Sequence, residues 1–312
     1  MTSAHALHGS AVAWLLPAAV VLVPALAYGA ALRLRRAGGR GWPRWRVVSL
    51  VVGLAMAATA VSPALQTAGH ADLRAHMVQH LLLGMYAPLA LVLAAPATLL
   101  LGALPVPARR RVACALRSRP LHVLAHPVTA ALLDVGGLHL LYLTPLYALA
   151  RDTPPVHHLV TAHVLLAGYL FAWSIGGPDP APHRPGTGTR VAVLIVAGAA
   201  HGHLAKLLYA GAGGLPPDLG APAGEVQEAA QLMYYGGTLA ELALAIALFG
   251  ARYRRGIRPA CGSACGATPR PSSPAPCATA PSAAAASARV PPPRPSRRPI
   301  RRARPPRSPA AR

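Results

Sequence analysis

Seven runs of about 20 mostly apolar residues make up much of this chain. They restrict the chain to folds that cross a membrane. An α-helix rises about 1.5 Å per residue, so a run of this length spans the hydrocarbon core of a bilayer. Only 12% of the 312 residues are charged, too few to cover a soluble domain of this size. The sequence predicts an all-α membrane bundle of about seven transmembrane helices. The predicted spans are 11–32, 47–66, 76–103, 127–149, 156–176, 191–212 and 229–250.

Charged residues in the connections predict the orientation of the bundle. The first, third and fifth connections and the C-terminal segment are rich in arginine, whereas the second, fourth and sixth carry most of the acids. Because basic connections stay on the cytoplasmic side, we expect the N-terminus outside and the C-terminus inside. No basic residue precedes the first span, so we interpret it as a membrane anchor, not a cleaved signal peptide. Pro88 and Pro96 interrupt the long third span, which predicts a kink or a tilt there.

Two domains follow from the change in composition near residue 250. Residues 1–250 form the predicted transmembrane domain, and residues 251–312, rich in Ala, Pro and Arg, form a predicted disordered cytoplasmic tail. The tail holds 14 of the 30 basic residues, so the net charge of +22 gives no reason to expect nucleic-acid binding. Its arginines instead favour contact with membrane lipid. Cys261 and Cys265 have a spacing used by copper thiolate sites, which we interpret here as coincidence.

Several of the fourteen histidines lie within or beside the spans, where ionisable groups are costly and usually functional. His76 and His80 are four residues apart, so they share one helix face. They are either metal ligands or a polar helix end at the water interface. His158 and His163 are five apart, about 140° around a helix, and face one point only if the first turn is irregular. His201 lies inside the sixth span.

The depth of these histidines connects them. Counted from the predicted outer end of each span at ~1.5 Å per residue, His76, His80, His163 and His201 all fall in the outer half. Imidazole binds copper, zinc and haem iron, so the pattern favours a metal or haem site near the outer face. The remaining intramembrane charges are Asp134, Lys206 and Glu241, and each acid is expected to be neutral or paired if it faces the bundle.

Two groups of motifs carry a family resemblance over roughly residues 10–250. His76-Met77-Val78-Gln79-His80, followed by Ala87-Pro88-Leu89 and Ala95-Pro96-Ala97-Thr98, resembles the CtaG-type cytochrome c oxidase assembly factor family. The segment from His163 to Trp173 and the turn Gly177-Pro178-Asp179-Pro180 are similar to its fifth helix and the turn after it. Many members have an Asp-Gln pair near the start of the seventh span, where this chain has Ala230-Gln231.

The resemblance implies a multi-pass protein of the bacterial inner (plasma) membrane that helps cytochrome c oxidase subunits mature, without being an enzyme. It also implies copper handling near the outer face, with a predicted metal-ligand set of His76, His80, His158, His163 and His201. Two alternatives remain at this point. One is a haem- or quinone-linked redox protein that uses His139, His201 or His203. The other is a transporter that moves copper or protons past Asp134, Lys206 and Glu241.

Overall fold

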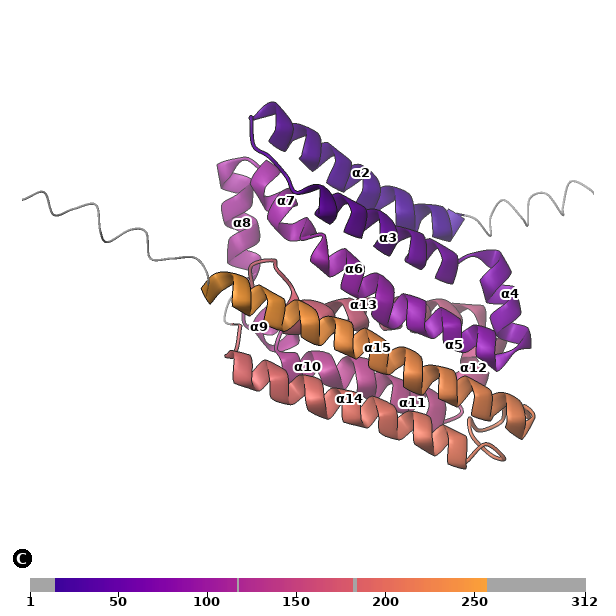
Figure 1. Ribbon diagram of the computed structural model, residues 1–312. Helices are drawn as coiled ribbons and strands as arrows, with labels where there is room; N and C mark the ends of the chain where they lie inside the picture. The colour runs from indigo at the N-terminus through magenta and orange to yellow at the C-terminus, as the bar shows by residue number, and fades with distance from the viewer. Residues whose placement is uncertain (1–14, 117, 182–183, 257–312) are drawn as a thin grey trace, which may run out of the picture. The chain divides into compact units, whose positions relative to one another are not determined.

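The computed structural model describes residues 15–116, 118–181 and 184–256, which form helices and short connections without a strand among them (Figure 1). Among these residues, five helices are long and apolar enough to cross a membrane, or seven spans if each of two bent helix pairs counts as one. The predicted all-α multi-span fold is confirmed. The five are Ala18–Ala37, Leu73–Leu93, Pro154–Gly176, Thr187–Ala210 and Ala223–Tyr253, and the bent pairs are Arg44–Ala60 with Pro63–Ala71 and Pro127–Leu143 with Leu146–Asp152.

The second predicted span is one of the bent pairs. Helix α2 (Leu15–Ala37) packs against α3 (Arg44–Ala60), and α4 (Pro63–Ala71) leaves the line of α3 at an angle of 49°. The side chain of Ser62 accepts the backbone N–H of Leu65 at 3.3 Å and caps the start of α4. The apolar run 47–66 therefore contains a bend that its hydropathy does not reveal.

The third predicted span continues past Pro88 and breaks at Ala95, seven residues later. Its elements are α5 (Leu73–Leu81), the π-helical turn η1 (Leu82–Tyr86), α6 (Ala87–Leu93) and α7 (Pro96–Ala103). Pro88 lies in the first turn of α6, directly after the wider π-helical turn. The break is at Ala95, whose φ of 53° is left-handed, so that α7 starts in a new direction at Pro96. Of the two prolines predicted to interrupt the span, Pro96 directly follows this break, whereas Pro88 lies within the continuous helix Leu73–Leu93.

The fourth predicted span is also bent, and its bend helps to build the site described below. Helices α8 (Val106–Leu116) and α9 (Arg119–Leu124) precede it. Helix α12 then turns by 82° away from α11, at Thr144 and Pro145. This turn lets Tyr142 of α11 and Tyr147 of α12 line the same cavity. The span consists of α10 (Pro127–Ala131), η2 (Leu132–Gly136), α11 (Gly137–Leu143) and α12 (Leu146–Asp152).

The last three helices pack closely around the third span. Helix α15 (Ala223–Gly256) runs beside α14 (Thr187–Ala210) and contacts α5, while α13 (Pro154–Gly176) crosses η1 (Figure 1). Glycines permit the closest approaches, as they do between other membrane helices. A Cβ at Gly168 of α13 would collide with the carbonyl oxygen of Gly84, and one at Gly237 of α15 would collide with the ring of His201.

Candidate metal site

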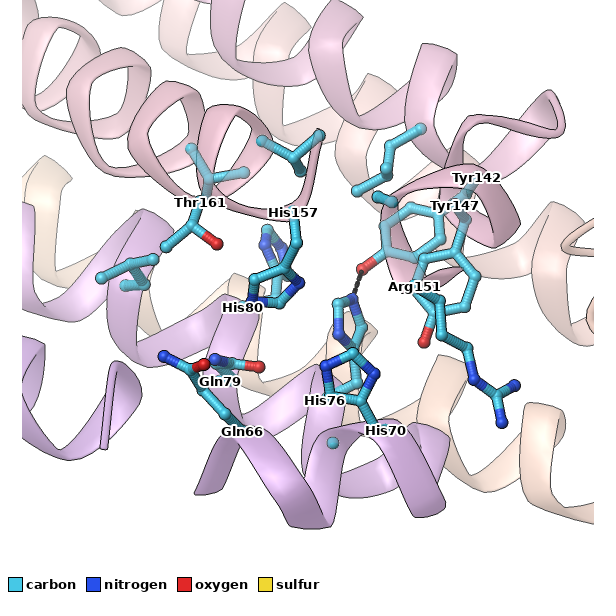
Figure 2. A pocket seen from close by; sticks show the side chains of 16 residues that line it. Gln66, His70, His76, Gln79, His80, Tyr142, Tyr147, Arg151, His157 and Thr161 are labelled. Atoms are coloured by element: carbon cyan, nitrogen blue, oxygen red, sulfur yellow. Dashed lines mark hydrogen bonds between the residues drawn. The ribbon is translucent and has the colours of Figure 1, made fainter. Parts of the chain in front are cut away.

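A cavity of about 50 Å³ lies among α4, α5, α11, α12 and α13, and histidines line much of it (Figure 2). This volume holds a few water molecules or a metal ion with its ligands, because one water needs about 10–15 Å³. We call it the histidine cavity. Its polar and aromatic lining residues are Gln66, His70, His76, Gln79, His80, Tyr142, Tyr147, Arg151, His157 and Thr161.

His76 and His80 both line the histidine cavity, as their spacing on one helix face predicts. His76 Nε2 lies 3.1 Å from the Tyr142 hydroxyl, and its ring packs edge-on against Tyr147 with 4.8 Å between ring centres. The Tyr142 ring also lies edge-on to His80, at 6.4 Å. The Tyr142 hydroxyl is therefore a hydrogen-bond partner of His76. With His80, Tyr142 makes a ring contact instead.

His80 lies beside His201 of α14, with 6.2 Å between their ring centres. The two residues are 6% and 2% exposed. The buried Nε2 atom of each has no hydrogen-bond partner among the residues that the structure describes. A buried polar atom without a partner is costly, so these two nitrogens indicate a missing ligand or water. His201 Nδ1 also lies 3.5 Å from a carboxylate oxygen of Glu241.

His70 and His157 lie together on the wall of the same cavity. Their ring centres are 5.3 Å apart, and their rings are tilted by 33°. His157 Nε2 is buried without a hydrogen-bond partner among the described residues, and His70 is exposed. Figure 2 shows His157 in front of His80, and His70 beside His76.

Two residues of the predicted ligand set lie away from the histidine cavity. His158 is exposed, and its ring stands edge-on to that of His157 with 5.8 Å between centres. His163 is also exposed, and its Nε2 donates to the backbone carbonyl of Leu133 at 3.0 Å. Helix α13 is regular through this region, so its 3.6-residue period turns His163 away from the side of His157.

The histidines of the haem alternative are also separated by the fold. His139 Nδ1 lies 2.9 Å from the carbonyl of Val135 in its own helix. His203 is exposed on α14, two positions from the buried His201, as a rotation of about 200° predicts. Lys206 is exposed as well, and its ammonium lies 5.3 Å from the ring centre of Tyr234.

The two intramembrane acids line the same small cavity inside the bundle. Asp134 of η2 and Glu241 of α15 line one small cavity of about 20 Å³, together with Gly84 and Gly168. This is room for one water molecule. Glu241 therefore contacts this inner cavity on one side and His201 on the other. The sequence predicted that these acids would be neutral or paired, and the fold places one of them beside an imidazole.

A polar pocket of about 200 Å³ adjoins the histidine cavity. Its lining comes from 69–73, from Tyr147 and Arg151, and from 219–222 with Glu225. The three connections predicted to lie outside therefore meet at one end of the bundle. It shares Gly69, His70, Tyr147 and Arg151 with the histidine cavity. Its acids are Asp72 and Glu225. Hydrogen bonds from Arg74 lower the pKa of the Asp72 carboxyl, which therefore stays ionised at neutral pH.

Two of the sequence motifs meet at the other end of the third span. The carboxylate of Asp179 accepts the backbone N–H groups of Ala97 and Thr98, at 3.0 and 2.7 Å, and the Thr98 hydroxyl at 2.5 Å. Asp179 is 2% exposed. It thus caps the first turn of α7. The Gly-Pro-Asp-Pro turn and the Ala-Pro-Ala-Thr segment are therefore two halves of one structural contact.

Among the described residues, no three His, Cys, Asp or Glu side chains are close enough together to hold one metal ion. The histidines are instead arranged as neighbouring pairs, His70 with His157 and His80 with His201. Cys114 is exposed in α8, and Cys261, Cys265 and Cys277 lie outside the described residues. A metal site in this part of the chain would therefore rest on two imidazoles.

The chain is thus a multi-pass helical membrane protein with a histidine-lined cavity at one end of its bundle. Residues 26–255 match the model of the cytochrome c oxidase caa3 assembly factor family. This match covers most of the chain, and the protein belongs to that family.

Relatives among curated proteins are mycobacterial and are described as uncharacterized. Proteins of Mycobacterium bovis and Mycobacterium tuberculosis are each 35% identical over 170 residues, which is 52% of this chain and 26% of theirs. A Mycobacterium leprae protein is 37% identical over 161 residues, 49% of this chain and 24% of its own length. The chain thus spans about a quarter of the length of these relatives. No solved structure matches it.

Proposed function

We propose that this protein assists the maturation of cytochrome c oxidase by holding a copper ion, as cargo, between His80 and His201. Membership of the oxidase assembly factor family supports the client. The observation that carries the copper site is the pair of buried, unpartnered Nε2 atoms on neighbouring rings. The proposal involves no turnover, since the protein would bind and release an ion without changing it chemically.

The spacing of the two rings suits one bridging ion. Two metal–nitrogen bonds of about 2 Å on opposite sides of an ion place imidazole ring centres about 6 Å apart. The ring centres of His80 and His201 are 6.2 Å apart. Imidazole is a good ligand for copper, and monovalent copper accepts two ligands in a nearly linear arrangement. Structural zinc sites take four ligands, so a two-imidazole site favours monovalent copper.

Charge also favours a cation at this position. A cation in the bundle interior is stable only near compensating charge or dipoles. Glu241 lies at the Nδ1 side of the His201 ring, away from the proposed ion at Nε2, and provides an acidic group close to the site. His76 stands one turn before His80 and lines the same cavity, so it is a third imidazole close to the site. The ligand roles predicted for His158 and His163 are not part of this proposal.

The test compares two histidines on one helix. In cells that lack the native gene, His201→Ala should abolish most oxidase activity and lower the copper content of the purified oxidase. His203→Ala, two residues away on the exposed face of α14, should leave both unchanged. Immunoblots of membranes check that both variants accumulate like the wild type. Normal oxidase activity with either His80→Ala or His201→Ala would overturn the proposed site.

A further inference from the structure

The histidine cavity contains a second imidazole pair that the proposed function does not use. His70 belongs to α4 and His157 to α13, and the two helices bring the rings to 5.3 Å between centres. His157 Nε2 is buried and lacks a hydrogen-bond partner among the described residues. This pair therefore shares two features with His80 and His201: neighbouring rings and a buried nitrogen without a hydrogen-bond partner among the described residues. Of the inner pair, His80 also lines this cavity, and His201 lies beside His80 on α14.

The surroundings of this pair attract cations. His70 lines both the histidine cavity and the polar pocket, so it stands where the two meet. The carboxylates in the polar pocket are Asp72 and Glu225, and the opposing charge is Arg151. Glu225 accepts the backbone N–H of Leu73 at 2.6 Å, which fixes this carboxylate at the base of α5.

Arg74 pairs with Asp72 at 2.9 Å and with Glu228 at 2.8 Å, so each of its contacts is to a carboxylate. Counting Glu228 and Arg74 with the lining residues, the pocket and its immediate neighbours hold three carboxylates and two arginines. The chain as a whole is strongly basic, with a net charge of +22. A local excess of carboxylates beside a cavity raises the local concentration of cations and speeds their capture.

We propose that His70 and His157 form a second, outer copper site that loads the inner pair, His80 and His201. This inference rests on the proposed function, because it names the route by which the inner site receives its ion. A ring separation of 5.3 Å suits two imidazoles on one ion in a bent arrangement. His76 and His80 line the cavity together with His70 and His157, and His201 adjoins His80. An ion can therefore move inward by exchanging one imidazole for the next without changing its charge or oxidation state.

The experiment titrates the full-length protein in detergent with monovalent copper alone, without oxygen, against a coloured competing chelator. The wild type should bind two ions, one more weakly than the other. His70→Ala and His157→Ala should each remove the weaker ion and keep the tighter one. His158→Ala is the matched control, since His158 is the exposed neighbour of His157, and it should bind as the wild type does.

A second readout is the rate at which the inner site fills. In stopped-flow mixing, loss of the outer pair should slow loading of the inner site by about tenfold, the lower end of the gain in association rate that local concentration of an ion provides. His157→Gln keeps a polar side chain and covers the case in which His157→Ala fails to fold, which size-exclusion chromatography would reveal. An unchanged number of ions and an unchanged loading rate in His70→Ala and His157→Gln would overturn the outer site.

The two proposals fail in different ways. If the inner site is wrong, a His80→Ala/His201→Ala variant will bind as many ions as the wild type. If the outer site alone is wrong, that variant will bind none, whereas the outer-site model predicts one remaining ion. X-ray absorption of that remaining ion should show nitrogen ligands of imidazole type. A spectrum without them would contradict the outer pair even if an ion were bound.

Discussion

At the scale of single residues, the site depends on which nitrogen of each imidazole is available. A metal-binding histidine usually donates its other ring N–H to a carboxylate, a carbonyl or water, which fixes its tautomer and orientation. Glu241 lies 3.5 Å from His201 Nδ1 and is the carboxylate placed to take this role, while Nε2 stays without a partner among the described residues. Glu241 would act as a positioning residue, since the carboxylate acts on the ion through His201.

Replacing Glu241 by glutamine should therefore weaken copper binding without removing it. Loss of such a supporting carboxylate costs 10–100-fold in metal affinity, and we expect about tenfold here because the contact is long. Chelator competition on the purified variant measures the change. Asp134→Asn is the control, as Asp134 lines the same small cavity as Glu241, whereas Glu241 is the acid beside His201. Equal affinities for wild type and Glu241→Gln would exclude a positioning role.

Individual residues show how much of the candidate site the sequence predicts. The i, i+4 spacing of His76 and His80 correctly placed both on one cavity. It could not assign His201 as the neighbour of His80, because that contact depends on how α14 and α15 pack. The burial of His157 Nε2 could not be predicted either, because a histidine at a helix start is usually interfacial. Its burial follows from the α11–α12 bend, which folds Tyr147 and Arg151 onto the same cavity.

At the scale of helices, close glycine contacts hold the site together. Gly84 follows His80 by one turn, and its backbone touches Gly168 of α13. A side chain at either position would separate η1 from α13 and would change the distance between His80 and the α13 wall of the cavity. The sequence showed these glycines as ordinary members of apolar runs. Hydropathy also hid the bends at Ser62 and Thr144, because capping residues and prolines occur in straight membrane helices too.

Gly168→Ala should thus destabilise the bundle, because its new Cβ would collide with the Gly84 carbonyl. Overpacking of this kind costs about 1–3 kcal/mol. Thermal unfolding in detergent, followed by circular dichroism, should show a lower midpoint. Gly136→Ala provides the comparison, since a Cβ at this helical position meets no atom within 4 Å. A Gly168→Ala midpoint equal to that of Gly136→Ala would contradict the close crossing.

At the scale of the whole molecule, apolar run length predicted the fold class and most span limits. The last span extends further, to Gly256, and the proposed tail lies almost entirely outside the described residues. The inside and outside assignment remains a prediction from connection charge. The fold adds that the second, fourth and sixth connections meet around one polar pocket. The histidine cavity adjoins that pocket, and an outward orientation would place it on the side where cargo copper arrives.

Metal analysis of the purified full-length protein, with a parallel absorption spectrum, tests the central claim most directly. The copper-cargo account predicts that the wild type retains copper in proportion to protein, with no haem bands. The His80→Ala/His201→Ala variant should retain distinctly less copper while eluting from size exclusion as the wild type does. Equal copper in the two proteins, or haem bands in the wild type, would contradict the account.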